Sequence, residues 1–375
     1  MKVYLDNAAT TPMAPEVIDA ITVVFKEQFG NPSSIHSFGR EARGILEVAR
    51  RQVAGFVGAE PKEIIFTSGG TEADNMAIRI AVKDLGVERI ISSTVEHHAV
   101  GHCLEACGVA TEMVQLLPTG RVDMEHLESL LKSGKKTLVS LMHANNEIGT
   151  LLDSEKVTEL CKKYNAWFHS DSVQTMGHYE INVADFGADF LTCSAHKFHG
   201  PKGIGFLYVN KDLKFSPMIH GGAQERGLRA GTENISGIVG LAKAMELAHE
   251  DMPTHQEYVQ GLKQHMIDEL KKRIPGVEFH GETDPAKSLY TVLNVCFPNF
   301  EKESMLLFLL DLEGIACSGG SACNSGASTG SHVLRGIGAN VDRPNARFSF
   351  SRYTTKGEID YTLEKIEQII LGKDQ

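Results

Sequence analysis

The sequence predicts an α/β fold, in which a large domain with a mostly parallel central sheet flanked by helices is joined to a smaller α+β C-terminal domain. Two patterns and the chain length support this prediction. Short strand-like runs are apolar at nearly every position, which is typical of sheets covered on both faces. Helical patterns separate several of these runs, as crossovers between parallel strands require. The 375 residues are enough for two domains and a large buried core.

The elements of the larger unit follow in order along the chain. A helix is predicted over residues 41–57, because apolar side chains recur along one face and Gly58 can end it. A strand at 63–66 is followed by a turn at 68–71 and a helix at 72–82. Further strands are predicted at 89–92, 137–141, 166–169, 190–192 and 203–209.

A second unit follows a long helical region that runs from Ile235 to about Arg273. It contains strand patterns at 276–279, 291–295 and 346–350, and then a helix from Lys356. This mixture predicts the smaller α+β domain. We expect residues 14–252 to form the large domain, and residues 1–13 with 253–375 to form the small one.

Composition excludes several functional classes. The net charge of −11 and a pI near 5.8 argue against a nucleic-acid surface, which needs a clustered basic face. No apolar run approaches the roughly 20 residues that span a bilayer, and residues 1–7 suggest a short strand and turn rather than a signal peptide. Seven cysteines without regular spacing indicate a reducing compartment. We therefore expect a cytoplasmic protein without membrane or direct nucleic-acid partners.

Two strand ends carry residues that a pyridoxal phosphate site needs. An apolar strand leads to Lys197, and an earlier strand leads to Asp171. The aldehyde of this cofactor requires a lysine amine to form a Schiff base, and its ring nitrogen requires a carboxylate to stay protonated and act as an electron sink. A lone Asp after a strand is usually a turn residue or a helix cap. Only the combination favours pyridoxal 5'-phosphate as the cofactor.

Other residues are candidates for the remaining cofactor contacts. The turn at 67–72 lies between a strand and a helix, where backbone N–H groups and the helix dipole would face a phosphate. Its glycines allow close approach and Thr71 adds a hydroxyl. The alternative is a plain turn that connects the strand and the helix. The further candidates are Ser194 and His196 for the phosphate, Gln174 and Asn146 for the phenolic oxygen, and His97 for the ring face.

A glycine-rich segment at residues 317–331 is too small in its side chains to pack a core, so we expect a mobile loop. A free cysteine on such a loop suggests a reactive thiol, and an incidental loop cysteine is the alternative. Arg347, on the strand that follows, suits bidentate capture of a substrate carboxylate. An arginine on a strand is otherwise usually a solvated surface group.

One segment allows a zinc site as an alternative. His98 with His102, and Cys103 with Cys107, have helical i,i+4 spacing. No tight Cys-x-x-Cys pair lies nearby, so the two cysteines are better explained as buried helix residues. We expect no metal.

Taken together, these residues resemble a cysteine desulfurase of the NifS/IscS type, within the class V, fold-type I pyridoxal-phosphate enzymes. The resemblance runs nearly end to end and is highly specific. It is carried by residues 5–11, 30–36, 67–72, 145–149, 196–197 with 200–203, 225–232, 321–323 and 347–349.

The resemblance implies a role for each candidate residue. Lys197 would carry the cofactor, Cys323 would accept sulfur, and His97 would stack on the ring and carry a proton. Asn7 and Arg347 would hold the substrate carboxylate. The implied cofactor contacts are Gly70, Thr71, His97, Asn146, Asp171, Gln174, Ser194, His196, Lys197 and, from the neighbouring subunit of a homodimer, Thr232.

The activity implied by the resemblance is conversion of L-cysteine to L-alanine, with transfer of sulfur to Cys323 as a persulfide. The long loop resembles the branch of the family that delivers sulfur to iron–sulfur scaffold or thiolation partners. A selenocysteine lyase or a class V aminotransferase is the alternative among enzymes. A catalytically idle scaffold that recruits sulfur-transfer partners is the alternative outside them, although Lys197, Asp171 and Cys323 argue against it.

The chain departs from the family pattern at two places. Residues 327–331 read Ala-Ser-Thr-Gly-Ser, where the family often has Ser-Leu-Glu-Pro-Ser, which leaves the choice of partner open. Cys317 stands where a small uncharged residue is usual. It could pair with Cys323 in a disulfide, or it could be a buried thiol at a strand end.

Overall fold

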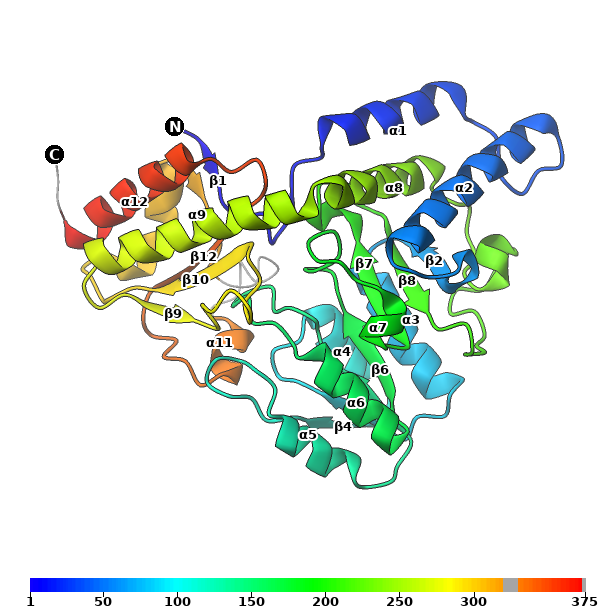
Figure 1. Cartoon of the computed structure of the whole chain (residues 1–375), viewed down its shortest axis with the longest axis horizontal. Helices are drawn as coiled ribbons and strands as arrows, with labels where there is room; N and C mark the ends of the chain where they lie inside the picture. Colours follow the sequence, from blue (N-terminus) through cyan, green and yellow to red (C-terminus); the bar gives the residue numbers. More distant parts are fainter. Residues whose placement is uncertain (320–329, 373–375) are drawn as a thin grey trace.

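The computed structural model describes residues 1–319 and 330–372, and Figure 1 shows a larger and a smaller unit. The larger unit is built on a seven-stranded sheet with the order β2-β8-β7-β6-β5-β3-β4. The strands from β7 to β4 are parallel, whereas β8 is antiparallel to both β7 and β2. The predicted mostly parallel sheet is confirmed. Its strands are β2 Ile64–Thr67, β3 Arg89–Ser92, β4 Ala110–Met113, β5 Thr137–Ser140, β6 Trp167–Asp171, β7 Phe190–Ser194 and β8 Gly205–Val209.

Helices cover both faces of this sheet, which explains why its strands are apolar throughout. Ile91 and Val139 pack into a core with α2, α5, α6, α7 and α8, whereas their neighbours Ile90 and Leu138 pack into a core with α3 and α4. Helix α1 packs on α8 at the outer side (Figure 1). The helices are α1 Pro15–Glu27, α2 Ser37–Phe56, α3 Gly70–Lys83, α4 His98–Ala106, α5 Met124–Leu131, α6 Ser154–Tyr164, α7 Val183–Phe186 and α8 Ile235–Glu250.

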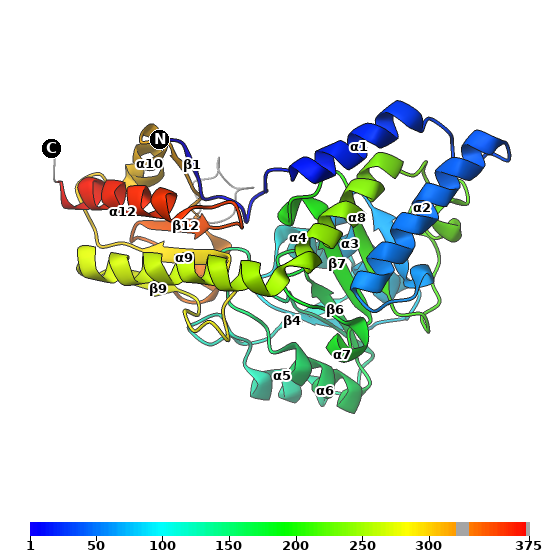
Figure 2. The ribbon, with the colours of Figure 1, turned by 45° about the horizontal axis from the view of Figure 1, so that its top comes forward.

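The smaller unit combines a three-stranded antiparallel sheet with helices, as Figure 2 shows. The first strand of the chain belongs to it, because Val3 and Leu5 share a core with Phe348 and Ile366. This shared core supports the proposed division at residue 252, which stays a prediction. The elements are α9 Met252–Arg273, α10 Leu306–Leu312, α11 His332–Gly336, α12 Lys356–Leu371, the sheet of β9 Glu278–His280, β10 Val292–Cys296 and β12 Asn345–Ser349, and the parallel pair β1 Val3–Tyr4 and β11 Ile315–Ala316.

Some element ends differ from the sequence prediction. The helical region after Ile235 is two helices, because Asp251 leaves helical geometry (φ −132°, ψ 30°) and α9 begins at Met252 with Pro253 in its first turn. Helix α2 begins at Ser37, four residues before the predicted start at residue 41. The His36 side chain caps it there by accepting from the Gly39 N–H. Strand β4 was missed, because it is a half-exposed edge strand without an apolar run.

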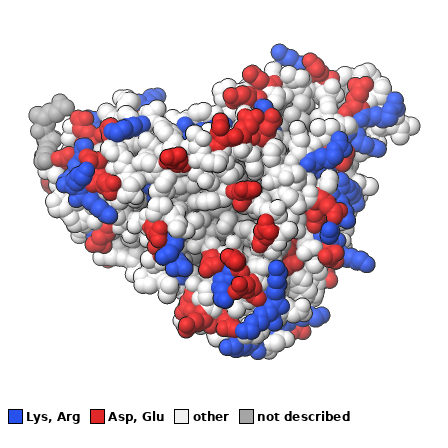
Figure 3. All heavy atoms as spheres, in the orientation of Figure 1, with Lys and Arg blue, Asp and Glu red and all other residues white. Residues whose placement is uncertain are grey.

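The outer surface mixes charges of both signs. On the face drawn in Figure 3, acidic and basic side chains lie interspersed over the helices. Within residues 1–319 and 330–372, no helix combines the length and apolar composition that crossing a membrane requires.

Candidate active site

A cavity of about 250 Å³ lies at the carboxyl ends of the parallel strands, where β12 of the smaller unit approaches them. This edge is where ligands bind in α/β sheets. Ala8, Ala9, Asp74, Met142 and Val173 line the cavity although sequence reasoning did not select them. The predicted site residues that line it are Gly70, Thr71, His97, Asn146, Asp171, Gln174, Ser194, His196, Lys197 and Arg347.

Lys197 ends a short 3-10 turn, Ala195–Lys197, directly after β7. Its Nζ donates to the carbonyl oxygens of Ala8 (2.5 Å) and Ala9 (2.9 Å). Gln174 Nε2 donates to the same Ala8 carbonyl at 3.1 Å. The N-terminal segment therefore fixes the amine inside the cavity through backbone atoms, which leave no residue-type signal in a sequence.

Asp171 is the last residue of β6 and is 6% exposed. Its carboxylate accepts from the Val173 N–H at 2.9 Å. Burial, and then the nearby Asp74, raise the pKa of Asp171 to about 6, while His97 opposes the rise. A buried carboxylate of this kind is stabilised by a cation brought close to it. The Asp171 carboxylate therefore fits a protonated pyridine nitrogen at this position.

Asp74 is a second buried carboxyl group in the cavity. It lies on α3, is 1% exposed, and its Oδ1 has no hydrogen-bond partner among the described residues. The same oxygen is 3.4 Å from His169 Nε2. Burial raises the pKa of Asp74 to about 7. A carboxylate on the apolar face of a predicted helix, next to Ala73 and Ala77, was the signal that could have found it.

Asp74 should make the cofactor-free protein less stable as pH rises. Its pKa is about 7 in the folded chain, against about 3.8 when unfolded, so its stabilising proton is lost as pH rises through 7. At about 1.4 kcal/mol per pKa unit, the loss has an upper limit of about 4 kcal/mol. In urea unfolding, we expect Asp74→Asn to have a higher free energy of unfolding than the parent at pH 8. At pH 5 this gain should be much smaller. A gain of equal size at both pH values would contradict the assignment.

The N-terminus of α3 faces the cavity and fits a phosphate. A Cβ on Gly70 would lie 2.8 Å from Val173 Cγ2, so a larger residue would push the two segments apart. Thr71 and Ser194 supply hydroxyl groups beside the N–H groups of the first helical turn. Burial, with smaller effects of nearby lysines, lowers the pKa of His196 to about 4, which keeps the ring neutral. Its Nδ1 lies 3.1 Å from Thr10 Oγ1, so Nε2 can serve as the second donor or acceptor.

His97 occupies the N-cap of α4, where its Nδ1 accepts from the Ala99 N–H at 3.2 Å. This bond places the proton of the neutral ring on Nε2. Burial lowers the pKa of His97, whereas Asp171 raises it and Lys197 lowers it further. The ring is therefore a neutral group that can exchange a proton inside the cavity.

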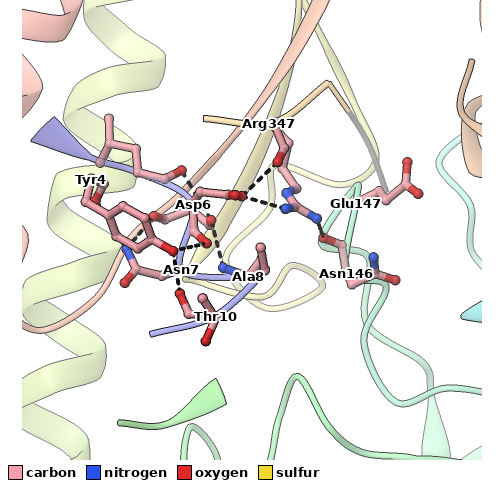
Figure 4. Close-up of polar contacts among 12 residues, drawn as sticks. Tyr4, Asp6, Asn7, Ala8, Thr10, Asn146, Glu147 and Arg347 are labelled. Carbon is pink, nitrogen blue, oxygen red and sulfur yellow. Dashed lines mark hydrogen bonds and ion pairs between the residues drawn. The ribbon is translucent and has the colours of Figure 1, made fainter. Parts of the chain in front are cut away.

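Arg347 brings a buried positive charge to the cavity, as Figure 4 shows. Its side chain is 1% exposed, Nη2 donates to Asp6 Oδ1 at 2.7 Å and Nη1 donates to the Asn146 carbonyl at 3.0 Å. Its Nε has no hydrogen-bond partner among residues 1–319 and 330–372. A guanidinium with an unused buried donor fits the carboxylate of an amino acid.

Three predicted residues do not line this cavity. Asn7, next to the lining residue Ala8, donates through Nδ2 to the Ser349 carbonyl at 2.8 Å, so its contact with substrate stays a prediction. Thr232 is exposed and lines a separate hollow with Ser68 and Arg229. Cys323 lies outside the described residues, and so does any pairing of it with Cys317.

None of Cys103, Cys107 and Cys317 lines the cavity. Cys317 follows β11, and burial is the main cause that raises its pKa to about 12. Cys103 is buried in α4, as expected, and Cys107 is partly buried at the end of that helix. The described part of the chain contains no group of three or more His, Cys, Asp or Glu side chains that could hold a metal ion.

Comparison with known proteins agrees with this geometry. The family model for aminotransferase class-V, a pyridoxal-phosphate-dependent family, matches residues 3–362. The chain is 46% identical to "Cysteine desulfurase IscS" of Dictyoglomus turgidum, over 98% of this chain and 94% of that protein. It is 43% identical to "Cysteine desulfurase IscS" of Clostridium botulinum strain Hall, with the same coverage. A solved structure described as "NIFS-LIKE PROTEIN" superposes with a TM-score of 0.91 at 37% identity, covering 98% of this chain and 99% of the other. The chain therefore belongs to the aminotransferase class-V family.

Proposed function

We propose that this chain is a cysteine desulfurase, which converts L-cysteine to L-alanine and passes the sulfur to Cys323. The observation that carries the proposal is the meeting of Lys197, Asp171 and Arg347 in one cavity, in a chain 46% identical to a curated cysteine desulfurase. The sulfur would supply iron–sulfur cluster assembly or thiolation, through a scaffold or sulfur-acceptor protein. Its site of action would be the cytoplasm, an idea supported by six described cysteines that are all unpaired.

Five residues of the cavity then have distinct tasks. Pyridoxal phosphate, when bound, draws electrons from the amino acid and so eases loss of its Cα proton. The Lys197 amine takes and returns that proton. Asp171 keeps the ring nitrogen positively charged, and the turn at Gly70 and Thr71 holds the phosphate. Arg347 orients the substrate through its carboxylate.

Sulfur transfer requires a second thiol near the substrate. Attack by the Cys323 thiolate on the substrate sulfur would form an S–S bond while the Cβ–S bond breaks and Cβ takes up a proton. The products are alanine and a persulfide on Cys323, so every atom of cysteine is accounted for. Because only the thiolate attacks, His97 is the proposed proton carrier for this step. Cys317, with a pKa of about 12, is a poor substitute.

The reaction products test this function. With L-cysteine and an excess of a small thiol, the holoenzyme should release alanine and sulfide in equal amounts, without any keto acid. An aminotransferase would instead need a keto-acid acceptor and would release no sulfide. A selenocysteine lyase would turn over L-selenocysteine far faster than L-cysteine. Either result would overturn the proposal.

We also propose that the enzyme is a homodimer, in which Thr232 binds the phosphate of the partner's cofactor. Thr232 is exposed and lies outside its own cavity. Three apolar side chains near the link between α1 and α2 are strongly exposed, as is typical of an interface: Phe25 (73%), Phe29 (81%) and Ile35 (91%).

Mixed dimers can test this shared site. Co-expression of Lys197→Ala and Thr232→Ala chains would place one intact site in each mixed dimer, because the intact lysine and threonine come from different subunits. Random pairing should then restore about a quarter of the parent activity. Each variant alone is the control. Activity no higher than the mean of the two controls would show that Thr232 does not act across the interface.

A further inference from the structure

The carboxylate of Asp6 joins two parts of the site that the proposed residue roles leave unconnected. Its Oδ1 accepts from Arg347 Nη2 at 2.7 Å and from Ser318 Oγ at 3.0 Å. Figure 4 shows Asp6 between β1 and Arg347, on the side of the guanidinium away from Asn146. One acidic side chain therefore contacts both the cation of the cavity and the residue that follows Cys317.

Backbone pairing fixes the place of this carboxylate. Asp6 forms a parallel bridge with Ser349, two residues beyond Arg347. Ser318 and Arg347 form an antiparallel bridge, with the Ser318 N–H donating at 3.2 Å and the Arg347 N–H at 2.6 Å. These two bridges hold the residues after β1 and the residues after β11 on β12, so Asp6 and Ser318 both lie beside Arg347.

Arg347 depends on this contact for its orientation. Its guanidinium is almost fully buried, and Asp6 is its only ion-pair partner among the described residues. A long side chain with several rotatable bonds keeps one orientation only if its ends are held. Asp6 holds Nη2 and the Asn146 carbonyl holds Nη1, which leaves Nε as a buried donor without a partner in the described chain.

We propose that Asp6 is a positioning residue for substrate recognition, which fixes the Arg347 guanidinium so that its unused donor meets the α-carboxylate of the amino acid. This inference rests on the proposed function of Arg347. Asp6 itself does not line the cavity and so acts through the arginine. An amide at position 6 can keep both accepted hydrogen bonds, whereas a methyl group keeps neither.

Steady-state kinetics of three holoenzyme variants test the proposal. Asp6→Ala should raise KM for L-cysteine about tenfold or more, because a misplaced binding group weakens substrate binding by at least that factor. It should change kcat less than about threefold, since the arginine does not take part in the chemical step. Asp6→Asn should keep KM within about threefold of the parent. Tyr4→Phe is the matched control, because it removes hydroxyl bonds to the Asp6 and Thr10 carbonyls and leaves the carboxylate intact.

A background without the arginine separates positioning from general damage. In Arg347→Ala, adding Asp6→Ala should raise KM no further, and the dissociation constant of L-alanine should follow the same pattern. An equal rise in both backgrounds, an unchanged KM in Asp6→Ala, or failure of Asp6→Asn to rescue would overturn the proposal. If Asp6→Ala does not fold, Asp6→Leu, which is closer in volume, takes its place with the same expected results. Failure of the proposed function would appear earlier, as a parent enzyme that makes no alanine from cysteine.

Discussion

Lys197→Ala should lower kcat for alanine formation by at least about 1000-fold, because no other amine of the described residues lines the cavity to move the Cα proton. Among the residues that line the cavity, Lys197 is the only lysine. Borohydride treatment of the parent holoenzyme should attach the cofactor to residue 197. Peptide mass spectrometry and single-turnover alanine formation measure the two outcomes.

Lys202 provides a matched control for this substitution. It lies five residues further along the chain and is exposed, so Lys202→Ala should keep parent activity and full borohydride labelling. Residual activity of Lys197→Ala above about one per cent, or cofactor attachment at another lysine, would show that the amine has been misassigned.

Cys323→Ala should keep the bound cofactor and the affinity for L-cysteine. Its rate of alanine formation should fall by at least about 100-fold. The reason is that the nucleophile for the substrate sulfur is gone, whereas the described cavity does not change. The absorbance of the bound cofactor checks the first part, and alanine release checks the second.

Cys317→Ala is the control that tests whether any nearby thiol suffices. A thiol with a pKa of about 12 carries little thiolate at neutral pH, so this variant should keep most of the parent activity and still form a persulfide. Sulfide release by Cys323→Ala at the parent rate would show that Cys323 is not the sulfur acceptor.

Much of the fold and of the cavity could be predicted, because apolar strands leave a strong sequence pattern and reactive residues follow strand ends. Lys197 and Asp171 were found from this rule, and both line the cavity. Strand β4 was missed because Thr111 and Glu112 interrupt the pattern in an edge strand, which needs no apolar run. Helix α2 was placed too late because its start depends on a histidine cap rather than on periodicity.

Contacts between distant segments could not be predicted. Asp6 and Arg347 are 341 residues apart, and no spacing rule pairs them. The Ala8 and Ala9 carbonyls that hold Lys197 belong to every peptide bond, so their residue types say nothing of their role. For Asp74 the helix pattern gave a sequence signal, but its closeness to His169 and to the predicted cofactor ligands came only from the fold.

The placement of the first strand has a consequence for how the enzyme matures. β1 pairs with β11, and Asp6 pairs with Ser349. The N-terminal strand therefore cannot form these pairs until residues more than 300 positions later have been synthesised. Until then the large helical and sheet layers can form, but the carbonyls that receive Lys197 are not yet locked in place. Such late, long-range closure slows folding. A nascent chain that has not yet reached Ser349 therefore lacks the contacts that hold Asp6 and Ala8 beside the cavity.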